Sequence, residues 1–301
     1  MKELIEIEFK KLQDYICNEL EKIDGKSLFQ SDIWNRAEGG GGTTKTISNG
    51  NVIEKGGVAF SAVFGDVTSD MKRQLGTEGD VFFATGVSIV LHPNSPHFPI
   101  IHMNVRYFEL DNGKYWFGGG IDLTPHYVIP ENASIFHYDL KKVCDKYDSN
   151  FYEKFKVWAD DYFFISHRNE TRGVGGIFFD HLSEGNCSLN KEEIMQFCLK
   201  LGYSFPEIYN KQIQLQLSKS ITDSQKKWQQ IRRGRYVEFN LVHDRGTKFG
   251  LVSGGRTESI LLSMPPTSMW EYNLVPENGS EEYNTLNFLK KGINWLDYKD
   301  K

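Results

Sequence analysis

Residues 99–108 read Pro-Ile-Ile-His-Met-Asn-Val-Arg-Tyr-Phe, and this stretch decides the predicted fold. Its β-branched and aromatic residues favour a strand, in which successive side chains point to opposite faces. One face then carries three polar side chains, those of His102, Asn104 and Arg106. The other face carries three apolar ones, those of Met103, Val105 and Tyr107. Because the apolar set can be buried, the strand is expected to lie in a sheet with one face on a core.

The polar row brings together a histidine, an amide and a permanent cation. Such a row suits an anionic ligand that must be held and then protonated or deprotonated. The alternative is an ordinary solvent-facing strand, because polar outer faces are common in antiparallel sheets. The decapeptide alone leaves both interpretations open.

The surrounding segments predict an α+β protein with a large, mostly antiparallel sheet. A hairpin joins 99–110 to 114–118 through Asp111-Asn112-Gly113, and the three glycines at 118–120 are expected to end it. Further strands are expected at 51–67, 85–91, 173–179 and 236–242. Helices are expected at 2–23, at 131–169 in two pieces, at 190–234 and at 280–291. Early strands with helices in the middle favour this class over a parallel sheet. Without a repeat or linker, residues 1–301 are expected to form one domain.

The composition narrows the class of protein. The 301 residues are 39% hydrophobic, 25% charged and 14% aromatic, which is typical of a soluble globular protein with a thick core or a flat-walled pocket. A net charge of −5 disfavours nucleic-acid binding, and no apolar run is long enough for a membrane span. The start lacks a signal sequence and the four cysteines lack CxxC spacing, so reduced thiols and a cytoplasmic location are expected.

Arginines lie scattered along this acidic chain. Separate arginines suit a ligand with several carboxylates, and Arg106 and Arg256 are assigned to it because a strand face or glycines let a ligand approach. The group Arg232, Arg233 and Arg235 is expected to be a solvated helix end. Asp244, at the predicted end of a strand, could accept hydrogen bonds from ring N–H groups of a ligand or cap its own turn.

Cofactor motifs are missing from the sequence. It contains neither the phosphate loop GxxxxGK[ST] nor a GxGxxG motif between a strand and a helix, so no nucleotide or flavin cofactor is expected. Eight histidines match no HExxH or zinc-finger spacing. A four-histidine metal site is conceivable, but most histidines are simply hydrogen-bonded core or surface groups.

Taken together, several motifs resemble one family, oxygen-dependent coproporphyrinogen III oxidase. The matching segments, in order, are Trp-Asn-Arg-Ala-Glu with four glycines at 34–42, then 86–93, 102–108, 116–125, 167–173, 236–247 and 254–266. They extend from about residue 30 to the C-terminal end. The resemblance implies a broad antiparallel sheet with helices on both faces, in a homodimer that associates through 236–270. It also implies O2 as co-substrate and oxidative decarboxylation of two propionates of coproporphyrinogen III to vinyl groups, giving protoporphyrinogen IX in haem synthesis.

The resemblance also assigns roles to residues of this chain. The positions implied to contact substrate are Ser88, Asn104, Val105, Arg106, Gly254, Gly255 and Arg256. His102 is implied to be the proton donor, and Asp244 to face the pyrrole N–H groups. The implied ligands of a divalent metal are His92, His102, His137 and His167. One departure stands out: the family usually has two aspartates after 178–179, whereas here Asp180 is followed by His181, which is expected to face solvent.

Two other functions use the same residues. A non-catalytic tetrapyrrole carrier would bind the porphyrinogen through the same arginines and aromatics and release no CO2. A histidine-liganded metal hydrolase would need metal and no oxygen. The histidine beside the predicted anion anchor favours a catalyst, because it serves no purpose in passive binding.

Overall fold

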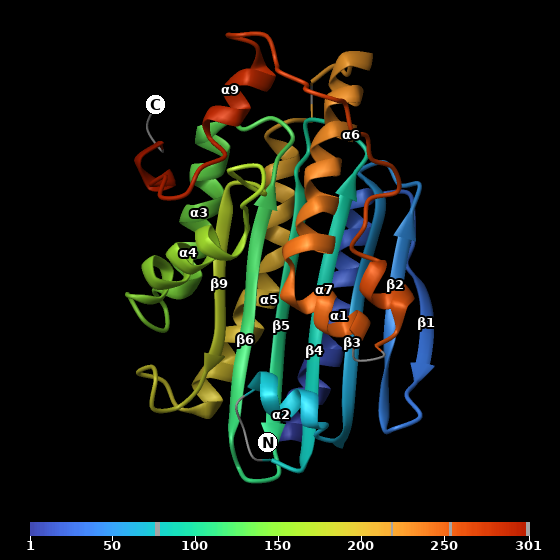
Figure 1. Ribbon diagram of the computed structural model, residues 1–301, viewed down its shortest axis with the longest axis vertical. Helices are drawn as coiled ribbons and strands as arrows, with labels where there is room; N and C mark the ends of the chain where they lie inside the picture. The colour runs from blue at the N-terminus through green and yellow to red at the C-terminus, as the bar shows by residue number, and fades with distance from the viewer. Residues whose placement is uncertain (76–78, 218, 253–254, 299–301) are drawn as a thin grey trace.

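The computed structural model describes residues 1–75, 79–217, 219–252 and 255–298. In this part of the chain, seven strands form one antiparallel sheet in the order β1-β2-β3-β4-β5-β6-β9 (Figure 1). The strands are β1 (Gln30–Asn35), β2 (Gly40–Ser48), β3 (Ile53–Asp66), β4 (Val81–Pro93), β5 (Ile100–Leu110), β6 (Tyr115–Thr124) and β9 (Gly175–Leu182). A separate short hairpin pairs β7 (Phe164–Ile165) with β8 (Glu170–Thr171). The expected class, α+β with a large antiparallel sheet, is confirmed.

Helices cover both faces of this sheet, as expected. Behind it in Figure 1 lie α1 and α5, which pack on each other, and α3 and α4 stand beside β9. In front lie α6 and α7, with α2 across the lower end. Their bounds are α1 (Lys2–Asp24), α2 (Ser69–Leu75), α3 (Pro130–Cys144), α4 (Phe151–Tyr162), α5 (Lys191–Gln214), α6 (Asp223–Glu238) and α7 (Arg245–Val252). The remaining helical segments are the π-helix η1 (Phe239–His243), α8 (Thr257–Leu261), α9 (Glu281–Asn287) and the 3-10 helix η2 (Trp295–Tyr298).

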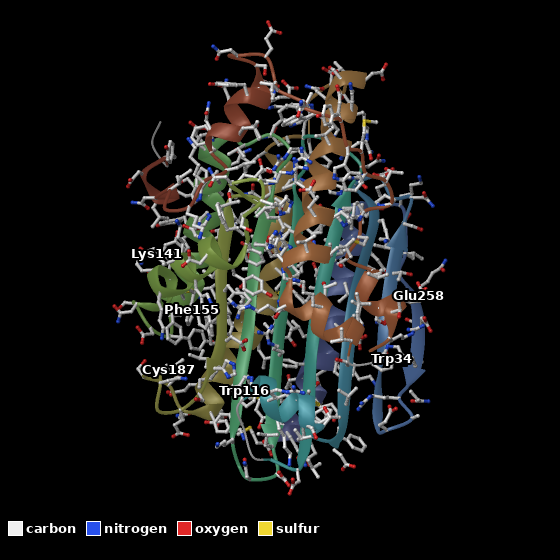
Figure 2. The ribbon with its side chains drawn as sticks, in the orientation of Figure 1. Trp34, Trp116, Lys141, Phe155, Cys187 and Glu258 are labelled. Atoms are coloured by element: carbon white, nitrogen blue, oxygen red, sulfur yellow. The ribbon has the colours of Figure 1, made fainter. Side chains whose placement is uncertain are left out.

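The main core lies between the sheet and the rear helices. On β5, Met103 and Val105 are 0% exposed and Tyr107 is 1% exposed, whereas the alternate residues stay half-buried. Phe155 of α4 belongs to this core, and Trp116 packs against a smaller cluster that includes Met71 of α2; Figure 2 labels both aromatic side chains. The alternation predicted for 99–108 is therefore confirmed: one face is core and the other is free to carry chemistry.

Two local predictions were wrong. The strand predicted at 236–242 is instead the end of α6 followed by η1, because Tyr236 and Phe239 pack on the guanidinium of the buried Arg172. Asn240 also donates to the Tyr236 carbonyl (2.8 Å), a helical side-chain bond that a strand could not make. The glycines at 118–120 do not end β6, which runs through them to Thr124.

The sequence also left two strands unassigned. β1 and β2 lack a regular apolar alternation, and β2 opens with Gly40, Gly41 and Gly42. A Cβ at Gly40 would come within 2.2 Å of the Ala62 carbonyl oxygen, so the glycine is required by close approach of β3. All four cysteines are free thiols, as expected. Within the described residues, no helix is both long and apolar enough to cross a membrane.

Candidate active site

The polar face of β5 lies at the centre of the sheet, opposite the main core. Ser88 of β4 pairs with Asn104, and Asn104 pairs in turn with Gly120 of β6. One step along, Gly86 pairs with Arg106 and Arg106 with Gly118. Because paired residues point to the same face, small side chains surround the polar row on both sides.

This central part of the front face remains accessible. Ser88 is exposed although β4 lies between β3 and β5 in the sheet, and Asn104 and Arg106 are half-buried. The neighbouring front-face positions of β3, Ala59 and Ser61, are also small and half-buried. A broad, flat molecule can therefore lie on this part of the sheet without displacing large side chains.

A chain of hydrogen bonds runs along the polar row. Nδ1 of His102 lies 2.7 Å from Oδ1 of Asp122, and its Nε2 lies 3.4 Å from Nδ2 of Asn104. Arg106 donates from Nη1 to Oδ1 of Asn104 (2.9 Å), and its Nη2 forms an ion pair with Asp180 (3.0 Å). The three side chains predicted to share one face are thus in mutual contact.

Asp122 fixes the tautomer and orientation of His102. Burial raises the pKa of this carboxyl, but the Arg172 guanidinium and the His102 hydrogen bond outweigh burial and hold its pKa below the usual range. The ionised carboxylate accepts a hydrogen bond from Nδ1 of His102, which leaves Nε2 facing the polar row. His102 is therefore oriented to exchange a proton at Nε2.

Arg172 holds Asp122 from the other side. Its Nη2 donates to both carboxylate oxygens at 2.7 Å, and both residues are almost completely buried. The guanidinium also lies 4.4 Å from the ring centre of Phe163, with two further rings close by. This buried ion pair, in which the guanidinium donates to both carboxylate oxygens, fixes the position of the Asp122 carboxylate.

Glycine makes room for the Arg106 ion pair. A Cβ at Gly118 would come within 2.6 Å of Nε of Arg106 and 2.7 Å of Oδ1 of Asp180. Asp180 is the first position of the family's expected aspartate pair, and here it carries the contact with Arg106. His181 in the second position is exposed and lies against Trp116, with ring centres 4.9 Å apart. The departure from the family pattern therefore leaves the Arg106 partner in place.

Asp244 lies near the same row but is already engaged. Oδ1 accepts from the Tyr162 hydroxyl (2.8 Å), and Oδ2 accepts from the backbone N–H and hydroxyl of Thr247 (2.7 and 2.8 Å). The Tyr162 ring stacks on Phe178, with centres 4.0 Å apart, and Phe178 lies under the Arg106 guanidinium. The sequence left two roles open for Asp244. The structure shows one of them, the cap of the turn at the start of α7. The other, contact with pyrrole N–H groups, remains a prediction.

Arg256 lies on the same side of the sheet, at its far edge. It forms an ion pair with Asp32 of β1, and its buried Nη1 has no partner within the described part of the chain. Asp32 is in register with Asn104 across four strand spacings, about 19 Å at the usual separation. Arg106 and Arg256 thus lie far enough apart to hold two separate anionic groups. Gly255 precedes Arg256, and Gly254 lies outside the described residues.

Two groups of predicted residues need correction. Val105 is 0% exposed in the core on the opposite face, so its side chain cannot contact a ligand on the polar row. Arg232 and Arg233 are buried rather than solvated, and Arg235 is largely covered. Arg232 pairs with Glu170 (3.0 Å) and Arg233 with Glu54, so these residues attach α6 to the rest of the fold.

The four histidines predicted to bind a metal lie in separate environments. His92 and His102 share a face on neighbouring strands, but His92 is bonded to the Ser263 carbonyl (2.8 Å). His137 is buried between Tyr152 and the Val174 carbonyl (3.0 and 2.9 Å). His167 contacts Glu238 and His243, each at 2.8 Å.

These environments do not fit a shared metal ion. Burial lowers the pKa of both His92 and His137 to about 3, so each is a neutral, hydrogen-bonded core group. Within the described ranges, no three His, Cys, Asp or Glu side chains are placed to hold a metal. The prediction that these four residues form one centre in this chain is therefore wrong, because the rings lie in separate environments and each has its own hydrogen-bond partner there.

Sequence reasoning gave no role to Asp122, Arg172 or Asp180. Asp122 could have been identified from the turn at Asp111–Gly113. This turn sets the β5–β6 register, and that register places Asp122 opposite His102. No local pattern indicates Arg172, which reaches the site from the β7–β9 region.

The fold and the site together define a known class, because the family model for coproporphyrinogen III oxidase matches residues 4–295. The chain belongs to this family. Three similar proteins illustrate the relationship. Coproporphyrinogen-III oxidase 1, chloroplastic, of Arabidopsis thaliana is 44% identical over 299 residues, which cover 94% of this chain and 76% of that protein. The human oxygen-dependent coproporphyrinogen-III oxidase, mitochondrial, is 44% identical over 98% of this chain and 67% of its own length. The oxygen-dependent coproporphyrinogen-III oxidase of Prochlorococcus marinus (strain MIT 9312) is 43% identical, over 96% and 91%.

Proposed function

We propose that this chain is an oxygen-dependent coproporphyrinogen III oxidase of haem synthesis. For each of two propionates, the side chain loses a hydride from its β-carbon and its carboxylate leaves as CO2. The electron pair of the bond to CO2 forms the vinyl double bond. O2 takes up the hydride together with one proton and becomes H2O2, so atoms and electrons balance without a further oxidant.

The single observation that carries this proposal is the continuous polar row on the accessible face of the sheet. Arg106 supplies a charge for one propionate, and its contacts with Asn104 and Asp180 fix the guanidinium. His102 lies beside it with Nε2 directed along the row. An anion anchor next to an oriented proton carrier matches a reaction in which a bound carboxylate side chain is transformed.

The remaining residues fit a large, flat, polyanionic substrate. Ser88 and the small residues around it leave room for a macrocycle on the sheet, and Arg256 would reach a second carboxylate. Asp244 is assigned to the pyrrole N–H groups. Burial and the neighbouring Asp244 raise the pKa of Tyr162, so its hydroxyl keeps its proton and holds that carboxylate in place.

Conversion of coproporphyrinogen III with and without O2 tests the proposal. The product is measured by porphyrin fluorescence after chemical oxidation, and CO2 is measured in parallel. We expect protoporphyrinogen and CO2 only in the presence of O2. Binding without CO2 release would indicate the carrier instead, and oxygen-independent turnover that requires metal would indicate the hydrolase.

We also propose a homodimer that associates through residues 236–270. Leu241, Val242 and Trp270 of this region are each about half exposed, so their burial against a second copy would stabilise such an interface. Val242→Asp should shift the mass in sedimentation or light scattering toward the monomer, whereas Val157→Asp, on the exposed face of α4, should not. A monomeric unmodified protein would contradict this proposal.

The cytoplasmic location is likewise a proposal, and the four free cysteine thiols support it because they suit a reducing compartment. The Arabidopsis and human relatives are named chloroplastic and mitochondrial. Fractionation of the source cells, with the chain detected by antibody, tests it: recovery in an organelle fraction would contradict it.

A further inference from the structure

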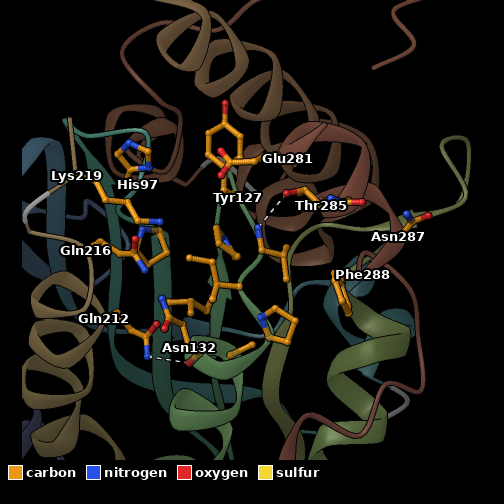
Figure 3. A pocket seen from close by; sticks show the side chains of 18 residues that line it. His97, Tyr127, Asn132, Gln212, Gln216, Lys219, Glu281, Thr285, Asn287 and Phe288 are labelled. Carbon is orange, nitrogen blue, oxygen red and sulfur yellow. Dashed lines mark hydrogen bonds between the residues drawn. The ribbon is translucent and has the colours of Figure 1, made fainter. Parts of the chain in front are cut away.

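A cavity of about 450 Å³ lies away from the polar row, near the ends of β5 and β6 (Figure 3). It is lined by Pro99 and Leu123 at the strand ends, by α3, by the C-terminal end of α5, and by α9. Leu123 belongs to the main core, whereas the preceding Asp122 contacts His102 on the opposite face. The sheet therefore separates this cavity from the candidate active site.

Two glutamines line one side of the cavity. Gln212 in the last turn of α5 and Gln216 just after that helix lie on the same side in Figure 3, and are 3% and 7% exposed. Gln212 donates from Nε2 to the Asn132 carbonyl (3.2 Å). The Gln216 Oε1 is buried and has no hydrogen-bond partner among the described residues. A buried amide oxygen without a donor is unfavourable, so a donor from a ligand would complete it.

The opposite wall is held in place by the C-terminal segment. The Val128 backbone N–H donates to the hydroxyl of Thr285 in α9 (3.0 Å), and Tyr127 donates to Glu282 (2.7 Å). Thr285 is 1% exposed, so this contact is part of the folded structure. Pro125, Pro130 and Phe288 add rigid or flat apolar surfaces. The cavity is thus formed before any ligand enters.

We propose that this cavity binds a small, uncharged, planar heteroaromatic compound with an amino or carboxamide N–H₂ group. Its N–H would donate to Oε1 of Gln216, and its ring would lie against the proline and Phe288 surfaces. The volume lies within the range of about 300–1,000 Å³ typical of small-molecule sites. Amide side chains match the donor and acceptor edges of such rings, and a carboxylate would instead face the lone pairs of Gln216.

Nicotinamide and nicotinate form a matched pair of probes, because they share one ring and nicotinate replaces the N–H₂ donor group by a charged carboxylate that only accepts. Titrations of the full chain, followed by ligand-observed NMR or calorimetry, should detect binding of nicotinamide and of adenine below about 10 mM. Nicotinate should bind at least about tenfold more weakly than nicotinamide. Failure of both nicotinamide and adenine to bind, or equal binding of nicotinamide and nicotinate, would overturn the proposal.

Gln216→Met removes the acceptor at nearly constant volume, and Gln214→Met makes the same change at an exposed position two residues earlier, at the end of α5. The first should weaken nicotinamide binding by about tenfold or more, and the second should leave it unchanged. Unchanged binding in Gln216→Met would overturn the proposal. The probe comparison on the unmodified protein decides the matter even if this variant does not fold. The site does not depend on the proposed function, so coproporphyrinogen turnover is not its readout.

Discussion

The two faces of β5 are fixed by different forces. On the rear face, Met103 and Val105 are completely buried, and their positions follow from close packing in the core. On the front face, His102 and Arg106 stay partly accessible, and a hydrogen bond to Asp122 and an ion pair with Asp180 hold them. Neighbouring residues of one strand should therefore respond differently to substitution: the front face through kinetics and the rear face through stability.

The largest effect is expected for His102→Ala. Loss of a positioned proton carrier lowers kcat by about 10²–10⁴-fold, with a small change in KM. Steady-state turnover of coproporphyrinogen III with O2 measures it. Wild-type-like kcat in this variant would remove His102 from proton transfer.

On the other face, Met103→Ala should lower the free energy of unfolding by about 2–5 kcal/mol, because it leaves a cavity in the core. The kcat of the remaining folded protein should stay close to that of the wild type. Urea unfolding and turnover on the same sample measure both quantities. A large loss of kcat without a loss of stability would contradict the distinction between the two faces.

Arg106→Ala should raise KM and lower kcat, because the lost anchor also positions the reacting propionate. A charge-assisted contact of about 1.5–3 kcal/mol corresponds to a loss in kcat/KM of about 10–150-fold. Arg106→Lys keeps the charge but not the paired geometry of the guanidinium, so its kcat/KM should lie between those of the wild type and Arg106→Ala. If the alanine and lysine variants had the wild-type kcat/KM, Arg106 would not be the anchor.

The smallest effect is expected for the acid stability of the protein, to which the buried His137 contributes. The folded pKa of His137 is about 3, below the unfolded value of 6.5, so its contribution is complete above pH 6.5 and is lost as pH falls toward 3. When the pH is lowered from 7.5 to 5.5, the free energy of unfolding should fall in both proteins. The fall should be about 1.4 kcal/mol smaller in His137→Gln than in the wild type. Urea unfolding at both pH values tests this. An unchanged pH dependence would mean that His137 is not held neutral.

The sequence predicted the central strands well because their alternation reflects one buried and one accessible face. The 99–110 segment is the best case, since every residue from 102 to 107 points to the expected side. Segment 236–242 was misassigned because its β-like aromatic residues pack on Arg172, a residue distant in the chain. The pattern of local residue types contains no information on that contact.

Part of the candidate site was also predicted from the alternation of side chains along β5. His102, Asn104 and Arg106 share a strand, so alternation alone brought them together. Asp122 follows from strand register, but Asp180 and Arg172 come from segments whose position depends on the whole fold. The prediction of a four-histidine centre failed because a list of residue types does not reveal that the rings lie apart, each with a hydrogen-bond partner of its own.

Binding of coproporphyrin III, the oxidised form that cannot react further, tests the central claim most directly. Fluorescence titration should show that Arg106→Ala raises Kd by about tenfold or more. Lys141→Ala, which removes one exposed charge from α3, should leave Kd unchanged. Equal Kd values for the wild type and Arg106→Ala would contradict the assignment of the polar face of β5 as the site that holds the substrate.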